Sequence, residues 1–195
     1  MSDPVDVLDY WLEEVGQAGW YAAGDDLDTE IRDRFSDVWK AALDGGLDHW
    51  IDGPAGTLAY IVLTDQFPRN MWRGQARAFA TDGLALAASE RAIAEGWDLQ
   101  APEPERQFFY LPFMHSEAPA HQTACIAYFA QRMPDTGAPN HLHARAHAAV
   151  IAQFGRFPYR NAALGRETTP AEATFMADGG YGSVVEALKA ADMPQ

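Results

Sequence analysis

The chain has 195 residues and a formal net charge of -14. A surface this acidic repels nucleic acid and anionic membranes, so neither is an expected partner. Hydrophobic residues make up 48% of the chain and aromatic residues 12%, which is typical of a folded globule and excludes a disordered chain. This length and composition predict a single domain over residues 1–195 with a substantial buried core.

Nothing in the sequence points to a secreted or membrane protein. The first residues, Met1 to Pro4, lack the basic and apolar regions of a signal peptide. The longest strongly apolar stretch, residues 58–63, is too short to cross a bilayer. Cys125 is the only cysteine, so no internal disulfide bond can form. We therefore expect a soluble, cytoplasmic protein.

Apolar residues follow helical spacing through almost the whole chain. Glycine and proline mark the ends of the predicted helices, and Ser, Thr and Asp mark their beginnings. The predicted helices cover residues 5–15, 29–43, 56–66, 82–95, 105–111, 117–133 and 141–154. Two more are predicted after Thr169 and Ser183, each followed three residues later by the Glu of a capping box. With about nine helices and no convincing strand pair, the predicted fold class is all-α.

A short motif that places Phe-Pro just before Arg-Asn, called the Phe-Pro phrase below, occurs twice. Residues 65–70 read Asp-Gln-Phe-Pro-Arg-Asn, and residues 154–161 read Phe-Gly-Arg-Phe-Pro-Tyr-Arg-Asn. Proline ends a helix and restricts the residue before it, and Asn favours the turn that follows. Each copy therefore predicts the end of a helix and a loop that holds guanidinium groups in place.

Arginine is concentrated around the two copies. The chain has 12 Arg and 2 Lys, and six of the Arg residues lie in or just after the copies. Guanidinium groups bind carboxylate and phosphate through paired hydrogen bonds, so they predict a cleft for a small anion or a peptide carboxylate. In the alternative, each Arg pairs with a carboxylate of a nearby helix and only stabilises the fold. The predicted ligand-binding residues are Arg69, Asn70, Arg73, Gln66, Tyr110, Arg156, Arg160, Asn161 and Arg166.

His115 is the candidate for proton transfer. It follows Pro112 in a predicted turn between two helices, where a side chain is able to reach a cleft. With Asp65 or Glu117 it makes a candidate acid–base pair at neutral pH, whereas a histidine buried in the core is the alternative. Ser116 is predicted to cap the next helix, because adjacent residues cannot face one another as a catalytic triad. The sequence leaves open whether the protein is an enzyme.

His141, His143 and His147 raise the question of a metal site. His143 and His147 are four residues apart and share a helix face, as pairs of zinc ligands do. No convincing third ligand lies nearby in the sequence, so we expect neither a metal nor another cofactor. The motifs of nucleotide-binding loops and of serine hydrolases do not occur in the sequence.

The motifs together resemble a bacterial family known as domain of unknown function 924. The resemblance reaches from residue 7 to about residue 176, and it implies a single domain of antiparallel helix pairs similar to a tetratricopeptide array. It implies no established activity or catalytic residues. Where the family usually has His, this chain has Tyr159; because Tyr titrates far above neutral pH, stacking or hydrogen bonding is the expected role of this position. The matching stretches are Val7–Trp11, Gly56–Gly74, Ala78–Asp82, Phe109–Glu117 and His147–Arg166.

Two functions follow from this sequence. In the first, the protein binds a small anionic ligand in a cleft lined by arginine. In the second, it is a non-catalytic scaffold, similar to tetratricopeptide proteins, that binds a segment of another protein. Arginine side chains saturated by carboxylates favour the scaffold. An open pocket with His115 and several arginines around it favours the ligand site.

Overall fold

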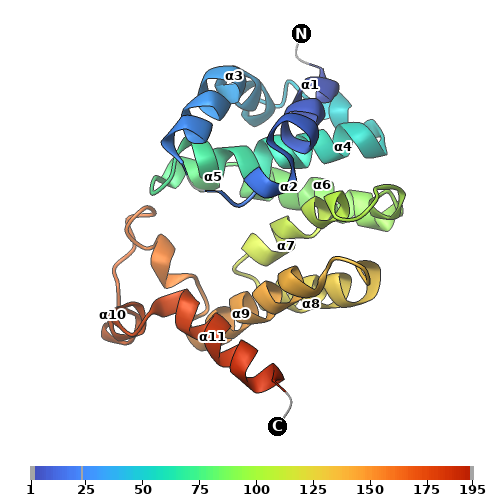
Figure 1. The fold of residues 1–195 in the computed structure, drawn as a ribbon. Coiled ribbons are helices and arrows are strands. Elements are labelled where there is room, and N and C mark those ends of the chain that lie inside the picture. The colour runs from blue at the N-terminus through green and yellow to red at the C-terminus, as the bar shows by residue number, and fades with distance from the viewer. Residues whose placement is uncertain (1–2, 23, 194–195) are drawn as a thin grey trace. The chain divides into compact units, whose positions relative to one another are not determined.

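The computed structural model describes residues 3–22 and 24–193. Every regular element in these residues is helical, which confirms the all-α prediction. Figure 1 labels the α-helical segments α1 to α11. Two pairs of these segments continue one another through a π-helix; if each pair is counted as one helix and the separate 3-10 turns are not counted, the described residues form nine helices. The contacts divide the chain into two compact units, one ending at Pro112 and the other beginning at Phe113. That the chain forms a single domain, and that its helices form an array similar to tetratricopeptide proteins, both remain predictions.

Two long stretches of the N-terminal unit pass from α-helix to π-helix. The first stretch contains α1 (Pro4–Leu8), η1 (Asp9–Val15, a π-helix) and α2 (Gly16–Gly19). The second contains α4 (Pro54–Ile61), η3 (Val62–Gln66, also π) and α5 (Phe67–Met71). The remaining α-helices are α3 (Asp25–Leu43) and α6 (Asp82–Ala94). The 3-10 turns are η2 (Asp48–Asp52), η4 (Ala76–Phe79), η5 (Asp98–Gln100) and η6 (Glu105–Phe109).

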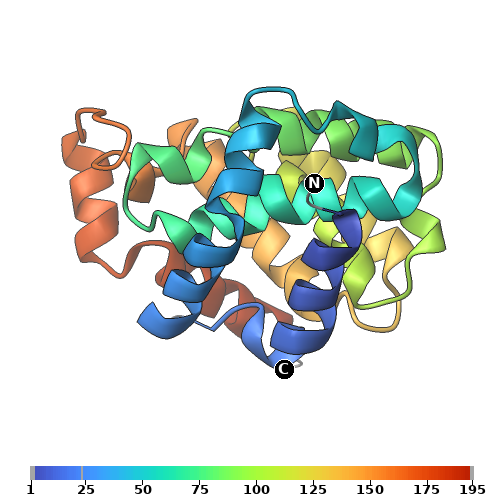
Figure 2. The ribbon, with the colours of Figure 1, turned by 90° about the horizontal axis from the view of Figure 1, so that it is seen from above.

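Aromatic side chains hold this unit together. α4 contacts α1 and α6, and α3 contacts α5. Tyr10 and Trp11 of η1 pack on Phe67, with ring centroids 6.0 and 5.4 Å away, and Phe35 of α3 approaches the same ring to 4.8 Å. Seen from above, α3 runs beside the stretch from α1 to η1 (Figure 2). Such tilted and edge-on ring contacts add to the gain from burial and fix the elements around Phe67.

The first Phe-Pro phrase does not end a helix, contrary to the prediction. The helix continues from Pro54 to Met71, and Pro68 lies in the first turn of α5. Proline has no N–H to bond the carbonyl of Thr64, four residues earlier. The wider π turn of η3 lies just before this proline, and the hydroxyl of Thr81 donates a hydrogen bond of 2.6 Å to the Thr64 carbonyl. The π turn and the Thr81 hydroxyl thus accommodate the proline, and the helix continues through it.

The C-terminal unit contains a helical hairpin with two further helices packed beside it. The hairpin helices α8 (Pro119–Arg132) and α9 (Ala138–Phe154) lie side by side in Figure 1. α11 (Gly180–Asp192) packs against α9, and α10 (Pro170–Ala177) contacts α11. The short helix α7 (Leu111–His115) contains the point in the chain where one unit ends and the other begins. Pro112 therefore lies inside a helix, whereas the sequence predicted that it ends one.

The second Phe-Pro phrase does follow the end of a helix, as predicted. α9 ends at Phe154, and Gly155 adopts the left-handed conformation with a φ of 69°. Its N–H donates to the carbonyl of Ile151 at 2.8 Å, a common way to end a helix that favours glycine. Pro158 then begins a 3-10 turn, η7 (Pro158–Arg160). The two copies differ because only the second has a glycine at the helix end.

The capping boxes predicted for the last two helices have different outcomes. At α10, Thr169 and Glu172 exchange the two hydrogen bonds of the capping box, as predicted. Ser183 does not cap a helix, because α11 begins earlier, at Gly180, and no side chain caps its start. Ser183 instead donates to the carbonyl of Gly180 at 2.8 Å. The first backbone N–H groups of α11 therefore lack the side-chain acceptor that a cap supplies.

None of the helices in the described part of the chain combines the length and the apolar character needed to cross a bilayer.

Candidate functional site

Arg69 is held by carboxylates within the N-terminal unit. Its two terminal nitrogens donate to the two oxygens of Asp82 at 3.0 and 3.1 Å. Nη1 also donates to the carbonyl of Asp65 at 2.6 Å and lies 3.2 Å from Oδ1 of the same residue. The paired geometry with Asp82 is the strong form of an Arg–carboxylate contact. Arg69 therefore links α5 to the start of α6.

Asp28 of α3 accepts hydrogen bonds from the next two predicted ligand-binding residues, Asn70 and Arg73. Nδ2 of Asn70 and Nη2 of Arg73 each donate to its Oδ1 at 2.9 Å, and Nε of Arg73 donates to Oδ2. Burial alone would raise the pKa of Asp28, but the hydrogen bonds from Arg73 and Asn70 lower it below its usual value. The charged carboxylate thus ties α5 and the residues after it to α3.

Gln66 and Tyr110 are buried in the same unit. Gln66 donates to the Asp65 carboxylate, and the hydroxyl of Tyr110 donates to Asp98 at 2.6 Å. The predicted site residues of the N-terminal unit thus bind protein groups, which favours the structural interpretation for them. The pairing of His115 with Asp65 stays a prediction.

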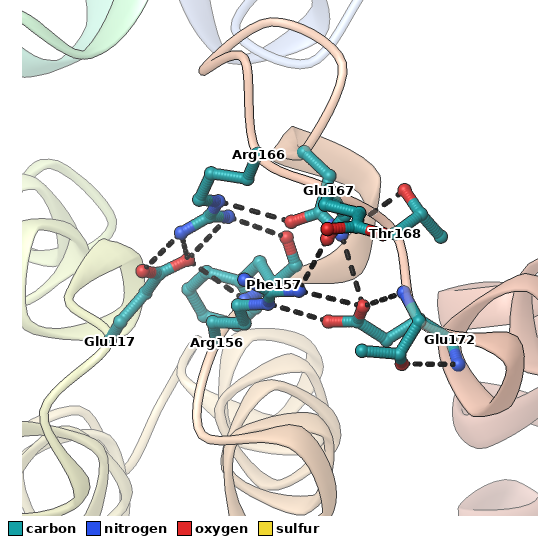
Figure 3. A network of polar contacts seen from close by, with 9 residues as sticks. Glu117, Arg156, Phe157, Arg166, Glu167, Thr168 and Glu172 are labelled. Carbon is teal, nitrogen blue, oxygen red and sulfur yellow. Dashed lines mark hydrogen bonds and ion pairs between the residues drawn. The ribbon is translucent and has the colours of Figure 1, made fainter.

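In the C-terminal unit, Arg166 binds Glu117 in the polar network of Figure 3. Nη1 donates to Oε2 at 2.8 Å and Nη2 to Oε1 at 3.1 Å. The N–H of Phe157 donates to Oε1 of Glu117 at 2.8 Å, and Nε of Arg166 donates to Asn161 at 3.0 Å. Burial alone would raise the pKa of Glu117, but these donors and the charge of Arg160 lower it.

Glu172 is the second carboxylate of the network (Figure 3). Nε and Nη2 of Arg156 donate to its two oxygens at 2.6 and 2.8 Å. Asn161 and the N–H of Thr169 donate to Oε2 at 3.3 and 2.8 Å. Above all, the hydrogen bonds from Arg156 hold the pKa of Glu172 far below its usual value. Glu117 and Glu172 together fix the loop between α9 and α10.

Arg160 lies in this loop and is almost fully buried, with 6% of its surface exposed. Its guanidinium carbon lies 4.5 Å from the centre of the Phe157 ring. The charges of Arg160 and His115 both lower the pKa of His147. The charge of Arg160 lowers the pKa of Glu117 as well, and that these residues form one site with His115 stays a prediction.

His147 is held in one neutral form. Its Nδ1 lies 2.8 Å from the carbonyl oxygen of His143, so Nδ1 carries the hydrogen and Nε2 carries a lone pair. Desolvation lowers the pKa of His147 to about 3, and the charges of His115 and Arg160 add to this shift, whereas the hydrogen bond to His143 opposes it. At neutral pH the ring is therefore a hydrogen-bond acceptor at Nε2.

An open pocket of about 490 Å³ lies beside His147. Tyr159 and Tyr181 line it together with Gly179, Gly180 and Gly182 at the start of α11. Gly179 and Gly180 have φ values of 99° and 54°, a conformation that side chains rarely adopt. The hydroxyl of Tyr181 lies 2.6 Å from Nδ1 of His143, which orients its ring. The pocket thus combines an uncapped helix start, two aromatic rings and a neutral histidine.

Sequence reasoning missed the glycines of this pocket, because it assigned the start of the last helix to Ser183. It did single out Tyr159 as a stacking or hydrogen-bonding residue and His147 as a metal-ligand candidate. The residue Tyr181 gave no signal of its own. The pair Gly179–Gly180 was the available clue, since two glycines before a helix bring its first N–H groups close to a ligand.

Within residues 3–22 and 24–193, no three His, Cys, Asp or Glu side chains are grouped as metal ligands would be. His143 and His147 instead contact the Tyr181 ring, with centroids 6.0 and 4.7 Å away.

The neutral state of His147 predicts a pH dependence of stability. Its pKa is 6.5 when unfolded and about 3 when folded, so the unfolded chain binds more protons between these values, and the difference approaches one proton near pH 5. The free energy of unfolding should therefore fall by about 1.5 kcal/mol more in the wild type than in His147→Gln between about pH 6.5 and 5. Urea unfolding at both pH values measures it. Equal losses of the free energy of unfolding in the wild type and in His147→Gln would contradict the assignment of a neutral, buried His147.

Comparisons with known proteins place the chain in a family. The family model for bacterial proteins of unknown function, DUF924, matches residues 7–180. The solved structure of a protein of unknown function from Agrobacterium tumefaciens is 39% identical and covers 90% of this chain and 97% of its own, with a TM-score of 0.83. The comparison with curated proteins finds no match. Since the model covers most of the sequence, the chain belongs to the DUF924 family of bacterial proteins of unknown function, as its motifs predicted.

Proposed function

We propose that the protein binds a small anionic ligand, a carboxylate or a phosphate, in the pocket at the start of α11. The observation that carries this proposal is the uncapped start of a 13-residue helix on a pocket. The first N–H groups of a helix and its dipole favour negative charge at this end. Gly179, Gly180 and Gly182 present no side chain that would keep an anion away from the backbone.

The other pocket residues restrict the ligand further. Nε2 of His147 accepts a hydrogen bond, which suits a ligand with a hydroxyl group near its anionic group. Tyr159 and Tyr181 offer aromatic rings for the carbon skeleton of the ligand. We therefore favour a hydroxy acid or the phosphate ester of a small alcohol.

The arginines of the second Phe-Pro phrase support the pocket in this proposal. Arg156 and Arg166 hold the loop that carries Tyr159 through their ion pairs with Glu172 and Glu117. Arg160 adds a buried positive charge near His147, which favours an anion in the pocket. If the ligand is turned over, His115 and Glu117 are the residues whose substitution should change the rate.

Substitution of Gly182 tests the proposal. Gly182→Asp places a carboxylate at the start of α11, where it satisfies the helix end itself and repels an anion. Nothing lies within 4 Å of a Cβ at this position, so the fold has room for the side chain. We expect Gly182→Asp to weaken ligand binding by at least about tenfold without lowering the melting temperature.

Gly182→Asn is the matched control, because it has the same shape without the charge. Thermal shift with a panel of hydroxy acids and phosphate esters identifies a ligand, and titration calorimetry with that ligand compares the proteins. Equal binding by the Asp and Asn variants, or a panel in which no compound raises the melting temperature, would count against the proposal.

The scaffold alternative is favoured by the carboxylate partners of Arg69, Arg73, Arg156 and Arg166. In that function the arginines only hold the helices together, and a protein segment is the ligand. A pull-down whose captured partner is retained by Gly182→Asp, together with a flat compound screen, would support the scaffold.

A further inference from the structure

Two tyrosine rings, called the aromatic corner below, meet in the pocket beside the start of α11. Tyr159 and Tyr181 both line this pocket. Their ring centroids lie 6.4 Å apart, and the angle between their planes is 70°. The pocket therefore has two aromatic walls that stand nearly at right angles to each other, and both belong to the C-terminal unit.

The core of the C-terminal unit fixes the first wall. The ring of Tyr159 stacks on that of Phe157, with centroids 5.3 Å apart and an angle of 23° between the planes. Phe157 is fully buried, whereas 38% of the surface of Tyr159 is exposed. A buried ring thus sets the plane of an exposed ring on the pocket wall, so this wall has its orientation before a ligand arrives.

The second wall is held by two histidines of α9. The hydroxyl of Tyr181 lies 2.6 Å from Nδ1 of His143, and the ring of His147 lies 4.7 Å from the Tyr181 ring. Burial raises the pKa of Tyr181 above its usual value, so the phenol stays neutral at physiological pH. The wall is therefore fixed in position, and it carries no negative charge that would repel an anion.

A thioether completes the apolar lining. Met176 lines the same pocket, and 43% of its surface is exposed. Its sulfur atom lies 3.5 Å from the position that a Cβ on Gly180 would occupy, so it is next to the backbone at the start of α11. Sulfur makes favourable contacts with aromatic rings, often at the ring edge. Met176 therefore adds a third group that favours an aromatic partner.

A planar aromatic ring gains more from these walls than a saturated one. Stacked and edge-on contacts between aromatic rings each add to the gain from burial, and walls at right angles offer both kinds of contact to one ligand ring. A saturated ring of the same size gains from burial alone. Because the two tyrosines are already held in place, little freedom is lost when the ligand binds.

We propose that the ligand of this pocket carries an aromatic ring next to its anionic group, as an aryl hydroxy acid or an arylmethyl phosphate does. This inference rests on the anion site proposed above and narrows its ligand class. The ring lies in the aromatic corner, between Tyr159 and Tyr181, and the anionic group lies at the start of α11.

Titration calorimetry of the full-length protein with two pairs of matched probes tests the inference. The pairs are benzyl phosphate with cyclohexylmethyl phosphate, and mandelate with hexahydromandelate; the members of a pair share the anionic group and the ring size. We expect the aromatic member of at least one pair to bind at least about fivefold more tightly than its saturated partner. A ratio near or below one in both pairs, or no measurable binding of any probe, overturns the inference.

Variants of Tyr159 locate the ligand ring. Tyr159→Leu keeps an apolar side chain without the aromatic face, so the preference for the aromatic probe should fall to less than about twofold. Tyr159→Phe is the matched control, because it keeps the ring and should keep the preference. Tyr159 is exposed, so both variants should melt close to the wild type. An unchanged preference in Tyr159→Leu overturns the inference, and the comparison of probes on the wild type needs no variant.

The Gly182→Asp variant separates this inference from the proposed function. If both members of a pair bind the wild type equally and bind Gly182→Asp more weakly, the anion site is supported and the aromatic inference is overturned. If the aromatic member is preferred but binds Gly182→Asp as tightly as the wild type, the aromatic corner is supported and the anion site is contradicted.

Discussion

Replacing Glu117 with Gln should lower the free energy of unfolding by about 3 kcal/mol. Glu117 accepts hydrogen bonds from Arg166 and from the N–H of Phe157, and 29% of its side chain is exposed. Gln keeps the shape but has one acceptor oxygen and no charge, so the guanidinium of Arg166 loses its paired contact. Urea unfolding at neutral pH measures the change.

Glu186→Gln is the matched control for this substitution. Glu186 also forms an ion pair, with Lys189 at 2.9 Å, but 72% of its side chain is exposed. Exposed pairs contribute little, so the control should change the free energy of unfolding by less than about 0.5 kcal/mol. Similar losses in the two variants would show that the network around Glu117 has no special weight.

Gly56→Ala should destabilise the protein by about 3 kcal/mol, although alanine is the better helix former. Gly56 lies in α4, and a Cβ at this position would lie 2.2 Å from the carbonyl oxygen of Trp50. The obstacle is backbone and not the end of a flexible side chain, so η2 has to move away from α4. Thermal or urea unfolding of the purified variant measures the loss.

Gly83→Ala is the control, because it should raise the stability that Gly56→Ala lowers. Gly83 lies in the first turn of α6, is exposed, and has nothing within 4 Å of a Cβ. This substitution should therefore stabilise the protein by about 0.5 kcal/mol, as expected for glycine replaced in a helix. A gain in both variants would show that α4 and η2 are not packed as closely as described.

The fold class could be predicted because helical spacing of apolar residues is a local property. The start of α10 could be predicted for the same reason, since Thr169, Pro170 and Glu172 carry all the information of a capping box. The continuation of the helix through the first Phe-Pro phrase could not be predicted from the sequence. It depends on the hydroxyl of Thr81, which reaches the Thr64 carbonyl from a distant part of the chain.

The candidate site could be predicted only in part. Arginine and histidine are conspicuous in a sequence and can be named as candidates, but that His115, Glu117 and Arg160 act together stays a prediction. The start of α11 is not conspicuous in the sequence. Its candidate ligand-binding groups are backbone N–H groups, and the glycines around them have no side chains whose chemistry would indicate a site. The partners of Arg69 and Arg73 depend on tertiary contacts, which residue spacing does not reveal.

The π turn of η3 makes the length of the chain before Pro68 as important as its composition. A π turn holds about one residue more than an α-helical turn, so deleting one residue from 62–66 would restore an ordinary α-helix and leave the following side chains on nearly the same faces. Deleting a residue from the α-helical turns of 54–61 would instead rotate the following side chains by about 100° around the helix axis, and Asn70 would turn away from Asp28 and Arg69 from Asp82. Relatives that keep these pairs should therefore differ in length between Pro54 and Asn70 only at the π turn.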